Sequence, residues 1–191
     1  MTSWNLEGSN DDSNWVVLRS HKNDMSLHDV SLSTSATCTM TYDIPQSTSL
    51  YRYLRLKLTD KCYDGTWTMS LGGVEFYGEL CGYGTPGVVK KPAVVPVKAP
   101  VIIPGLKSSQ FTYSGQDFDK KGIVHHLMQH STQGSGSYPI HASRISDAQG
   151  KAADPLFNVS GTCCTSNKIS NSWWKFDFQS RKVSPTKYVV C

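Results

Sequence analysis

The sequence predicts an all-β fold, an antiparallel sandwich or barrel built from short strands. Apolar and polar residues alternate with a period of two in segments such as residues 51–59 and 174–179. Clusters of Gly, Asn, Asp and Ser separate these segments, and helical periodicity is scarce. Short alternating segments with frequent turns are typical of sandwiches and barrels.

The length and composition favour one domain, or two small ones. The chain has 191 residues, of which 38% are hydrophobic and 10% aromatic. It can therefore bury a full core, and its composition is not that of a disordered protein. No run of 18 apolar residues occurs, so no membrane span is expected. The first residues lack the basic and apolar regions of a signal peptide, so we expect a cytoplasmic protein.

The excess of positive charge is local. Lys and Arg number 19 against 15 Asp and Glu, which gives a formal net charge of +4. Four lysines, Lys90, Lys91, Lys98 and Lys107, lie in a stretch without acidic residues. The rest of the chain is therefore neutral, which argues against a nucleic-acid partner.

The chain divides into three blocks. Residues 1–80 and 111–191 are rich in predicted strands, whereas residues 81–110 are rich in Pro, Val and Lys, with a proline at every fourth position from Pro92 to Pro104. Proline blocks helices and central strands, so residues 81–110 are expected to be an extended linker.

The first block begins with a predicted hairpin. Residues 4–7 and 15–18 are strand-like and flank the turn cluster 8–14. Next, a short strand over residues 37–42 is expected to stop before Pro45.

Alternation then assigns the buried faces. Leu54, Leu56 and Leu58 fall on one face of their strand together with Arg52, and Trp174, Phe176 and Phe178 fall on one face of theirs. Further strands are predicted at residues 67–71, 74–77 and 183–190, the last with a bend or an edge at Pro185.

Four segments of the first block share their pattern and order with one domain family. They are Trp4-Asn-Leu-Glu-Gly-Ser-Asn-Asp-Asp-Ser-Asn-Trp15, His21-Lys-Asn-Asp24, Tyr51-Arg-Tyr-Leu-Arg-Leu56 and Leu71-Gly-Gly-Val-Glu-Phe-Tyr-Gly78. These segments resemble the C-terminal half of the coagulation-factor type C, or discoidin-like (galactose-binding-like), domain. The similarity is greatest to the intracellular subgroup found in BTB/POZ proteins and HECT-type ubiquitin ligases.

The third block resembles the N-terminal half of the same family, so the two halves stand in reversed order. The segments are Gly122-Ile-Val-His-His-Leu127, Asn171-Ser-Trp-Trp-Lys-Phe-Asp-Phe178 and Val183-Ser-Pro-Thr-Lys-Tyr188. The resemblance implies a jelly-roll sandwich of about eight strands, circularly permuted. A fragment of a tandem array and a swapped dimer are the alternatives, and the chain is expected to be a monomer or such a dimer.

The permuted model carries two local expectations. In the family, residues 122–127 correspond to a strand, and the strands that include residues 4–7 and 188–190 are joined by a short turn. We therefore expect residues 188–190 to pair with residues 4–7.

No residue pattern supports catalysis, so a non-enzymatic role is expected, without cofactor or metal. His125, His126 and His130 lack the H-E-x-x-H pattern, because Leu127 stands where the Glu would be. Asp11 and Asp12 lie in a turn cluster, where side-chain capping explains them better than a cation site does.

Two further groups of residues are expected to have structural roles. Glu7, Arg55 and Asp177 are expected to form a buried set of ionic or hydrogen-bonded pairs. The six cysteines include no Cys-x-x-Cys pair, and without a signal peptide they are expected to be reduced thiols. The sequon at Asn158 matters only in a secreted protein.

The resemblance implies ligand binding by loops at one end of the sandwich, which correspond to residues 129–140 and 143–168. Candidate ligand-binding residues there are Gln129, His130, Gln133, Tyr138, His141 and Arg144, which offer stacking and hydrogen bonding. The expected function is recognition of a protein partner, within a ubiquitin-ligase-type or scaffold assembly. A lectin-like carbohydrate-binding domain is the alternative.

Overall fold

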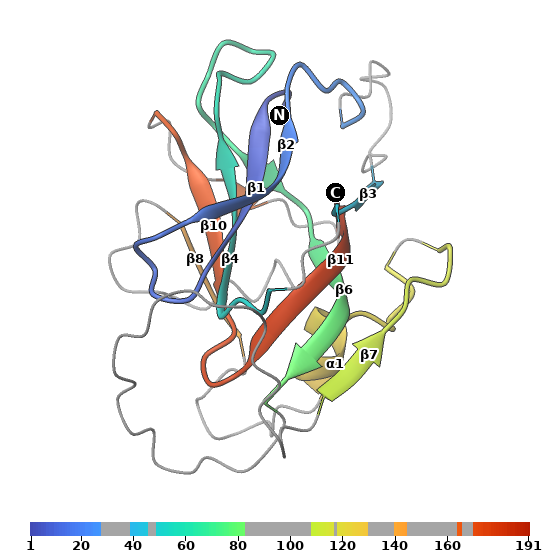
Figure 1. The fold of residues 1–191 in the computed structure, drawn as a ribbon. Coiled ribbons are helices and arrows are strands. Elements are labelled where there is room, and N and C mark those ends of the chain that lie inside the picture. Colours follow the sequence, from blue (N-terminus) through green and yellow to red (C-terminus); the bar gives the residue numbers. More distant parts are fainter. Residues whose placement is uncertain are drawn as a thin grey trace.

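A computed structural model describes residues 1–27, 39–45, 49–82, 108–116, 118–129, 140–144, 164–165 and 170–191. Its elements are β1 (Trp4–Ser9), β2 (Val16–His21), β3 (Met40–Asp43), β4 (Tyr53–Leu58), β5 (Ser70–Leu71), β6 (Val74–Cys81), β7 (Ser108–Phe111), α1 (Ile123–Gln129), β8 (His141–Arg144), β9 (Cys164–Thr165), β10 (Trp173–Asp177) and β11 (Lys182–Val190). These residues form a mostly β structure of two antiparallel sheets, as the sequence predicts (Figure 1).

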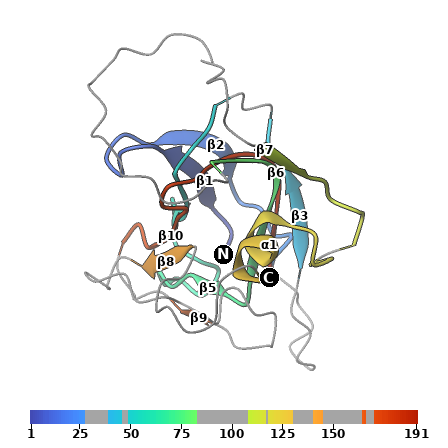
Figure 2. The ribbon, with the colours of Figure 1, turned by 90° about the horizontal axis from the view of Figure 1, so that it is seen from below.

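The two main sheets form the layers of a sandwich. One sheet has the strand order β2-β1-β4-β10-β8 and the other β3-β11-β6-β7, while β5 and β9 make a separate pair. Figure 2 shows the five-stranded sheet on one side of the molecule and the four-stranded sheet with α1 on the other. The described residues thus contain eleven strands, where about eight were expected.

Each main sheet contains strands from both ends of the sequence. In the five-stranded sheet, β4 pairs with β10, and in the four-stranded sheet β11 lies between β3 and β6. The two blocks flanking the predicted linker therefore fold together within one chain. Most of that linker lies outside the described residues, although Cys81 ends β6 and residues 108–110 already belong to β7.

The predicted buried faces are confirmed for the apolar residues. Arg52, assigned to the same face as the leucines, lies just before β4 instead, where its side chain is 40% exposed and pairs with Asp177. Leu54, Leu56, Leu58, Trp174, Phe176 and Phe178 are all buried in the core. The ring of Phe76, on β6, lies edge-on to the ring of Phe176, with 5.6 Å between centroids, and so joins the two layers. Burying a large apolar side chain contributes roughly 1.5–3 kcal/mol, so this interior is the main source of stability.

Strand β11 has a bulge at Pro185, which confirms the predicted bend. Its register with β6 shifts between Pro185 and Lys187, opposite Gly78. Gly78 has a φ of 138°, and a Cβ there would lie 2.2 Å from the carbonyl oxygen of Ser184. Only glycine fits this close approach, because the bulge and the backbone conformation both exclude a side chain.

The expected pairing of residues 188–190 with residues 4–7 is wrong. Strand β1 pairs with β2 and β4, whereas residues 188–190 pair with β3 and β6 in the other sheet. The two segments meet across the sandwich instead, because the Trp4 indole N–H donates a hydrogen bond of 3.2 Å to the Tyr188 hydroxyl.

A buried polar network surrounds that contact and ties the layers together. The His21 imidazole stacks on Trp4, and its Nε2 lies 2.6 Å from the Tyr188 hydroxyl. Its Nδ1 lies 2.6 Å from the Asp24 carboxylate. Burial lowers the pKa of His21 and so favours the neutral ring at pH 7. A neutral ring satisfies both contacts when Nδ1–H donates to Asp24 and Nε2 accepts from Tyr188.

Residues 123–129 form a helix, which corrects the expectation of a strand over residues 122–127. Ile123, Val124 and Leu127 lie on its buried face. The carboxylate of Glu75, on β6, accepts the N–H groups of Val124 at 2.6 Å and His125 at 2.9 Å, so it caps the first turn. In the described part of the chain, no helix is long and apolar enough to cross a membrane.

We expect Trp174→Ala to cost about 3–5 kcal/mol of unfolding free energy, the range for emptying a large core site. Its sequence neighbour Trp173 points away from the core and is only partly buried, so Trp173→Ala is the matched control and costs about 1 kcal/mol. Urea denaturation of both variants measures the difference. Equal losses would contradict the inward placement of Trp174.

We expect Glu75 to make the chain less stable as the pH rises. Burial raises its pKa from 4.5 to about 7. Between these values the folded state holds a proton that the unfolded chain releases, so stability falls by up to about 3 kcal/mol and then levels off. Because a glutamine side chain cannot titrate, the difference in stability between the native chain and Glu75→Gln, measured by urea denaturation from about pH 4.5 to pH 8, isolates this effect. A constant difference would contradict it.

Candidate functional site

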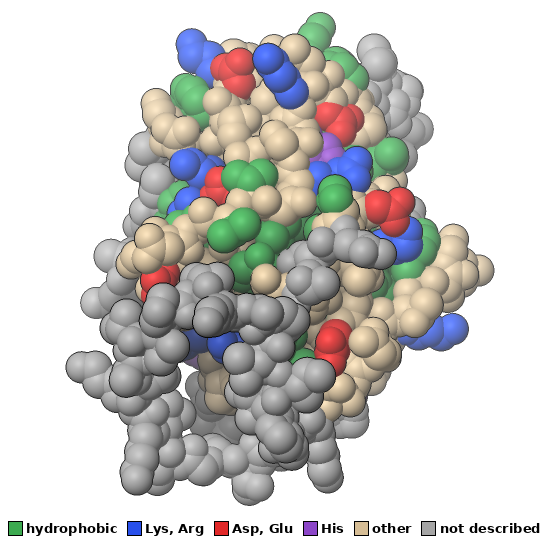
Figure 3. Space-filling view, in the orientation of Figure 1, with side chains coloured by type: hydrophobic (Ala, Val, Ile, Leu, Met, Phe, Trp, Pro, Cys, Tyr) green, Lys and Arg blue, Asp and Glu red, His purple; other side chains and the backbone are tan. Residues whose placement is uncertain are grey.

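The outward side of the five-stranded sheet carries aromatic and charged side chains. Because the alternate residues of β4 and β10 are buried, Tyr53, Arg55 and Lys57 on β4 and Trp173, Lys175 and Asp177 on β10 point away from the core. We call this surface the outer face; it also includes Glu7, Trp15, Arg52 and His141, and the Asp12 side chain lies over it. In Figure 3, cationic, acidic and apolar side chains are interspersed over these strands.

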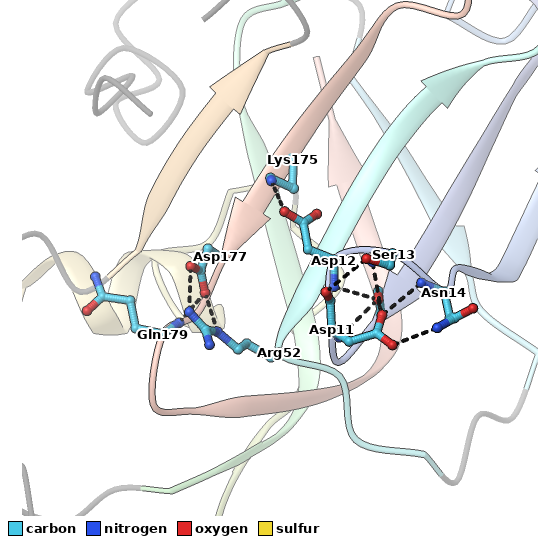
Figure 4. A network of polar contacts seen from close by, with 9 residues as sticks. Asp11, Asp12, Ser13, Asn14, Arg52, Lys175, Asp177 and Gln179 are labelled. Atoms are coloured by element: carbon cyan, nitrogen blue, oxygen red, sulfur yellow. Dashed lines mark hydrogen bonds and ion pairs between the residues drawn. The ribbon is translucent and has the colours of Figure 1, made fainter. Parts of the chain in front are cut away.

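Three ion pairs cross the outer face. The Nε of Arg55 lies 2.5 Å from the Glu7 carboxylate, joining β4 to β1. The Arg52 guanidinium donates two hydrogen bonds, of 2.9 and 3.0 Å, to Asp177 on β10. The Lys175 ammonium lies 2.5 Å from Asp12, in the turn between β1 and β2 (Figure 4).

The three ion pairs are not equally well anchored. Glu7 is only 6% exposed, and Asp177 also accepts the N–H of Gln179 at 2.7 Å. The Asp12 side chain, by contrast, is 40% exposed, and its carboxylate bonds to Lys175 and to no other residue of the described ranges. The pair between Asp12 and Lys175 is therefore the one that a competing anion displaces most easily.

The cations also lie against aromatic rings. Arg55 lies 3.9 Å from the centroid of the Trp15 ring, and Arg52 lies 4.6 Å from that of Tyr53. The Lys175 ammonium is 5.5 Å from the Trp173 ring and 5.7 Å from the Tyr53 ring. Each such contact contributes about 0.5–1 kcal/mol at a partly exposed site, and together they hold the side chains in place.

The turn that carries Asp12 is capped by Asp11. The Asp11 carboxylate accepts the N–H groups of Ser13 at 2.9 Å and Asn14 at 2.8 Å, and the Asn14 amide at 2.7 Å. These bonds hold the pKa of Asp11 well below its usual range. They agree with the capping predicted for this turn, and they fix the position of Asp12, whose φ is 62°.

Few of the predicted ligand-binding residues can be placed. His130, Gln133 and Tyr138 lie outside the described residues, and so does the side chain of Arg144 at the end of β8. Gln129 is exposed at the end of α1, which packs on the other sheet. His141 stands opposite Asp177 in the register of β8 and β10, so it is the predicted residue that joins the outer face.

The predicted set of Glu7, Arg55 and Asp177 is correct in part. Glu7 and Arg55 form a pair, but Asp177 pairs with Arg52 instead. Sequence reasoning also missed Trp15, Trp173 and Lys175. The signal for the last two was present, because residues 173 and 175 alternate with the buried positions 174 and 176 and therefore face solvent, where a Trp has no core role.

The described residues contain no group of three His, Cys, Asp or Glu side chains that could hold a metal ion. Cys62 and Cys81 are free thiols. Burial and the neighbouring Glu79 raise the pKa of Cys81 to about 11, and burial raises that of Cys62, so both thiolates are disfavoured at neutral pH.

No family model, no curated protein and no solved structure matches this chain.

We expect Glu7→Gln to destabilise the fold by about 1–3 kcal/mol, because it leaves the mostly buried Arg55 without its counter-charge. Asp12→Asn removes a more exposed charge and should cost less than about 1 kcal/mol. Asn tolerates the positive φ of position 12, so backbone strain does not confuse the comparison. Urea denaturation at low salt measures both values. A larger loss for Asp12→Asn would contradict the conclusion that the pair of Glu7 with Arg55 is better anchored than the pair of Asp12 with Lys175.

Proposed function

We propose that this chain is a non-catalytic binding module that recognises a protein partner through the outer face. The observation that carries the proposal is the set of half-buried Trp15, Tyr53 and Trp173 side chains, interleaved with Arg52 and Arg55 on the solvent side of a sheet. Trp, Tyr and Arg are the residue types that contribute most to protein–protein binding energy.

The form of the outer face favours a macromolecular partner. Most of its side chains stand on neighbouring β-strands, with Trp15 and Arg52 directly before β2 and β4, and their ion pairs and ring contacts restrict their motion before binding. A pre-organised surface loses little conformational entropy on association. A sheet surface also suits another protein better than a small molecule, which needs a concave site.

The sequence resemblance points in the same direction. Discoidin-like domains near ubiquitin ligases serve in partner contacts, so we place the proposed module in a ubiquitin-ligase-type or scaffold assembly. Segments 129–140 and 143–168, which the resemblance assigns to end loops, stay predicted contributors to recognition, although residue 129 ends α1, residues 143–144 belong to β8 and residues 164–165 form β9. His141, on β8, lies between these two segments and on the outer face.

We also propose that the sandwich is a discoidin-like jelly roll with its halves in permuted order. The support is the reversed order of the motifs together with the mixing of both blocks in both sheets. Superposition of an experimentally solved structure of this chain on such a domain, with the order of the halves exchanged, checks the assignment.

Selection of displayed peptides tests the binding role. A random library of 12-residue peptides is selected on the full chain, and the enriched peptides are then measured against Trp173→Ala. We expect at least a tenfold loss of affinity, the scale of a binding hot spot. Tyr63→Ala is the control, because Tyr63 is a highly exposed aromatic residue in the loop between β4 and β5.

Two outcomes would overturn the proposal. One is that the selected peptides bind Trp173→Ala and the native chain equally well. The other is that the peptides fail to bind while a glycan array gives binding that is lost in Trp173→Ala or in Tyr138→Ala, which would favour the carbohydrate-binding alternative.

A further inference from the structure

We infer that the outer face binds an acidic segment of its partner, and that Asp12 of the same chain competes with that segment. This inference rests on the proposed function, since it names the partner chemistry for the same surface. It is carried by Lys57, Trp173 and Lys175, which we call the lysine patch, and by the position of Asp12.

The lysine patch places two lysines at positions next to Trp173 on the sheet. Lys57 stands directly opposite Trp173 in the register of β4 and β10. Lys175 lies two residues further along β10, on the same face, with its ammonium 5.5 Å from the Trp173 ring. Lys175 is also directly opposite Arg55, and two cations at facing positions repel each other unless an anion lies between or beside them.

The charges in the patch are incompletely balanced. Arg52 and Arg55 are each bound to a well-anchored carboxylate. Lys57 makes no ion pair with any residue in the described ranges. Lys175 is balanced by Asp12 alone, through the loosest of the three pairs. A partner carboxylate beside Trp173 could therefore contact Lys57 directly and Lys175 after Asp12 has moved aside, which is the charge complementarity expected of an acidic segment.

Asp12 then acts as an internal substitute for the partner's carboxylate. It approaches Lys175 from the β1–β2 turn, whose backbone is held by Asp11, while its own side chain stays partly in solvent. An incoming anion must break this pair and is also repelled by the Asp12 charge. Removing that charge is therefore expected to strengthen binding of an acidic partner, and to leave binding of a neutral one unchanged.

The test uses the peptides selected from the 12-residue library. We expect Asp and Glu to be enriched among the peptides that depend on Trp173. Synthetic copies labelled with fluorescein are titrated by fluorescence polarisation, alongside copies in which each Glu is Gln and each Asp is Asn. Asp12→Asn should tighten binding of the acidic peptides about threefold, and Lys57→Gln should weaken it about threefold.

Asp43→Asn is the matched control. Asp43 pairs with Lys187 on the four-stranded sheet, so its replacement changes the net charge by the same amount away from the outer face. Its effect should stay below twofold. Thermal unfolding of each variant verifies that it is folded.

The outcomes separate the two proposals. Peptides that depend on Trp173 but are not acidic, or that respond equally to Asp12→Asn and Asp43→Asn, would overturn the acidic preference and leave the binding role in place. Absence of any peptide that depends on Trp173 would overturn both. Selected acidic peptides whose neutral copies bind equally well would also reject the role of Asp12.

Discussion

The structure depends on strand pairs formed between distant parts of the sequence. Leu58 and Trp173, at the ends of β4 and β10, are 115 residues apart, and Cys81 and Lys182, at the ends of β6 and β11, are 101 apart. All four strands occupy interior positions in their sheets. Neither sheet can therefore be completed by one block alone, and each block by itself would expose the apolar face that the other covers. The hydrogen bonds of Tyr188 with Trp4 and His21 extend the same dependence across the sandwich, from one layer to the other.

Much of the fold could be predicted because the alternation of apolar and polar residues along a strand is a simple local pattern. Where a strand is buried on one face, alternation alone assigns the core, and it did so for Leu54 and Leu56 as for Trp174 and Phe176. The helix at Ile123–Gln129 could not be found in this way, because its first turn is capped by Glu75, a residue almost fifty positions earlier. The neighbours of β1 and β11 were also beyond local reasoning, since strand pairing is decided by the whole sheet and not by either strand.

The candidate site was harder to predict than the fold for a physical reason. Its residues are not adjacent in sequence, and their roles come from facing positions on neighbouring strands, as for Lys57 and Trp173. The correct pairing of Glu7 with Arg55 and the missed pairing of Asp177 with Arg52 show the limit. Residue types indicate that charges will be paired, but the strand register determines which residue is the partner of which. The predicted loop residues, apart from Gln129 and His141, fall where the structure gives no side-chain description.

The spacing of the paired strands has a consequence for synthesis of the chain in the cell. A ribosome adds about 5–20 residues per second, so the 114 residues between β4 and β10 take roughly 6–23 s to emerge. During that interval the leucines of β4 lack the partner strand β10 on one side, and the opposing layer still lacks its central strand β11. Chaperones typically bind nascent chains that expose apolar segments, until the strands that cover those segments have been translated.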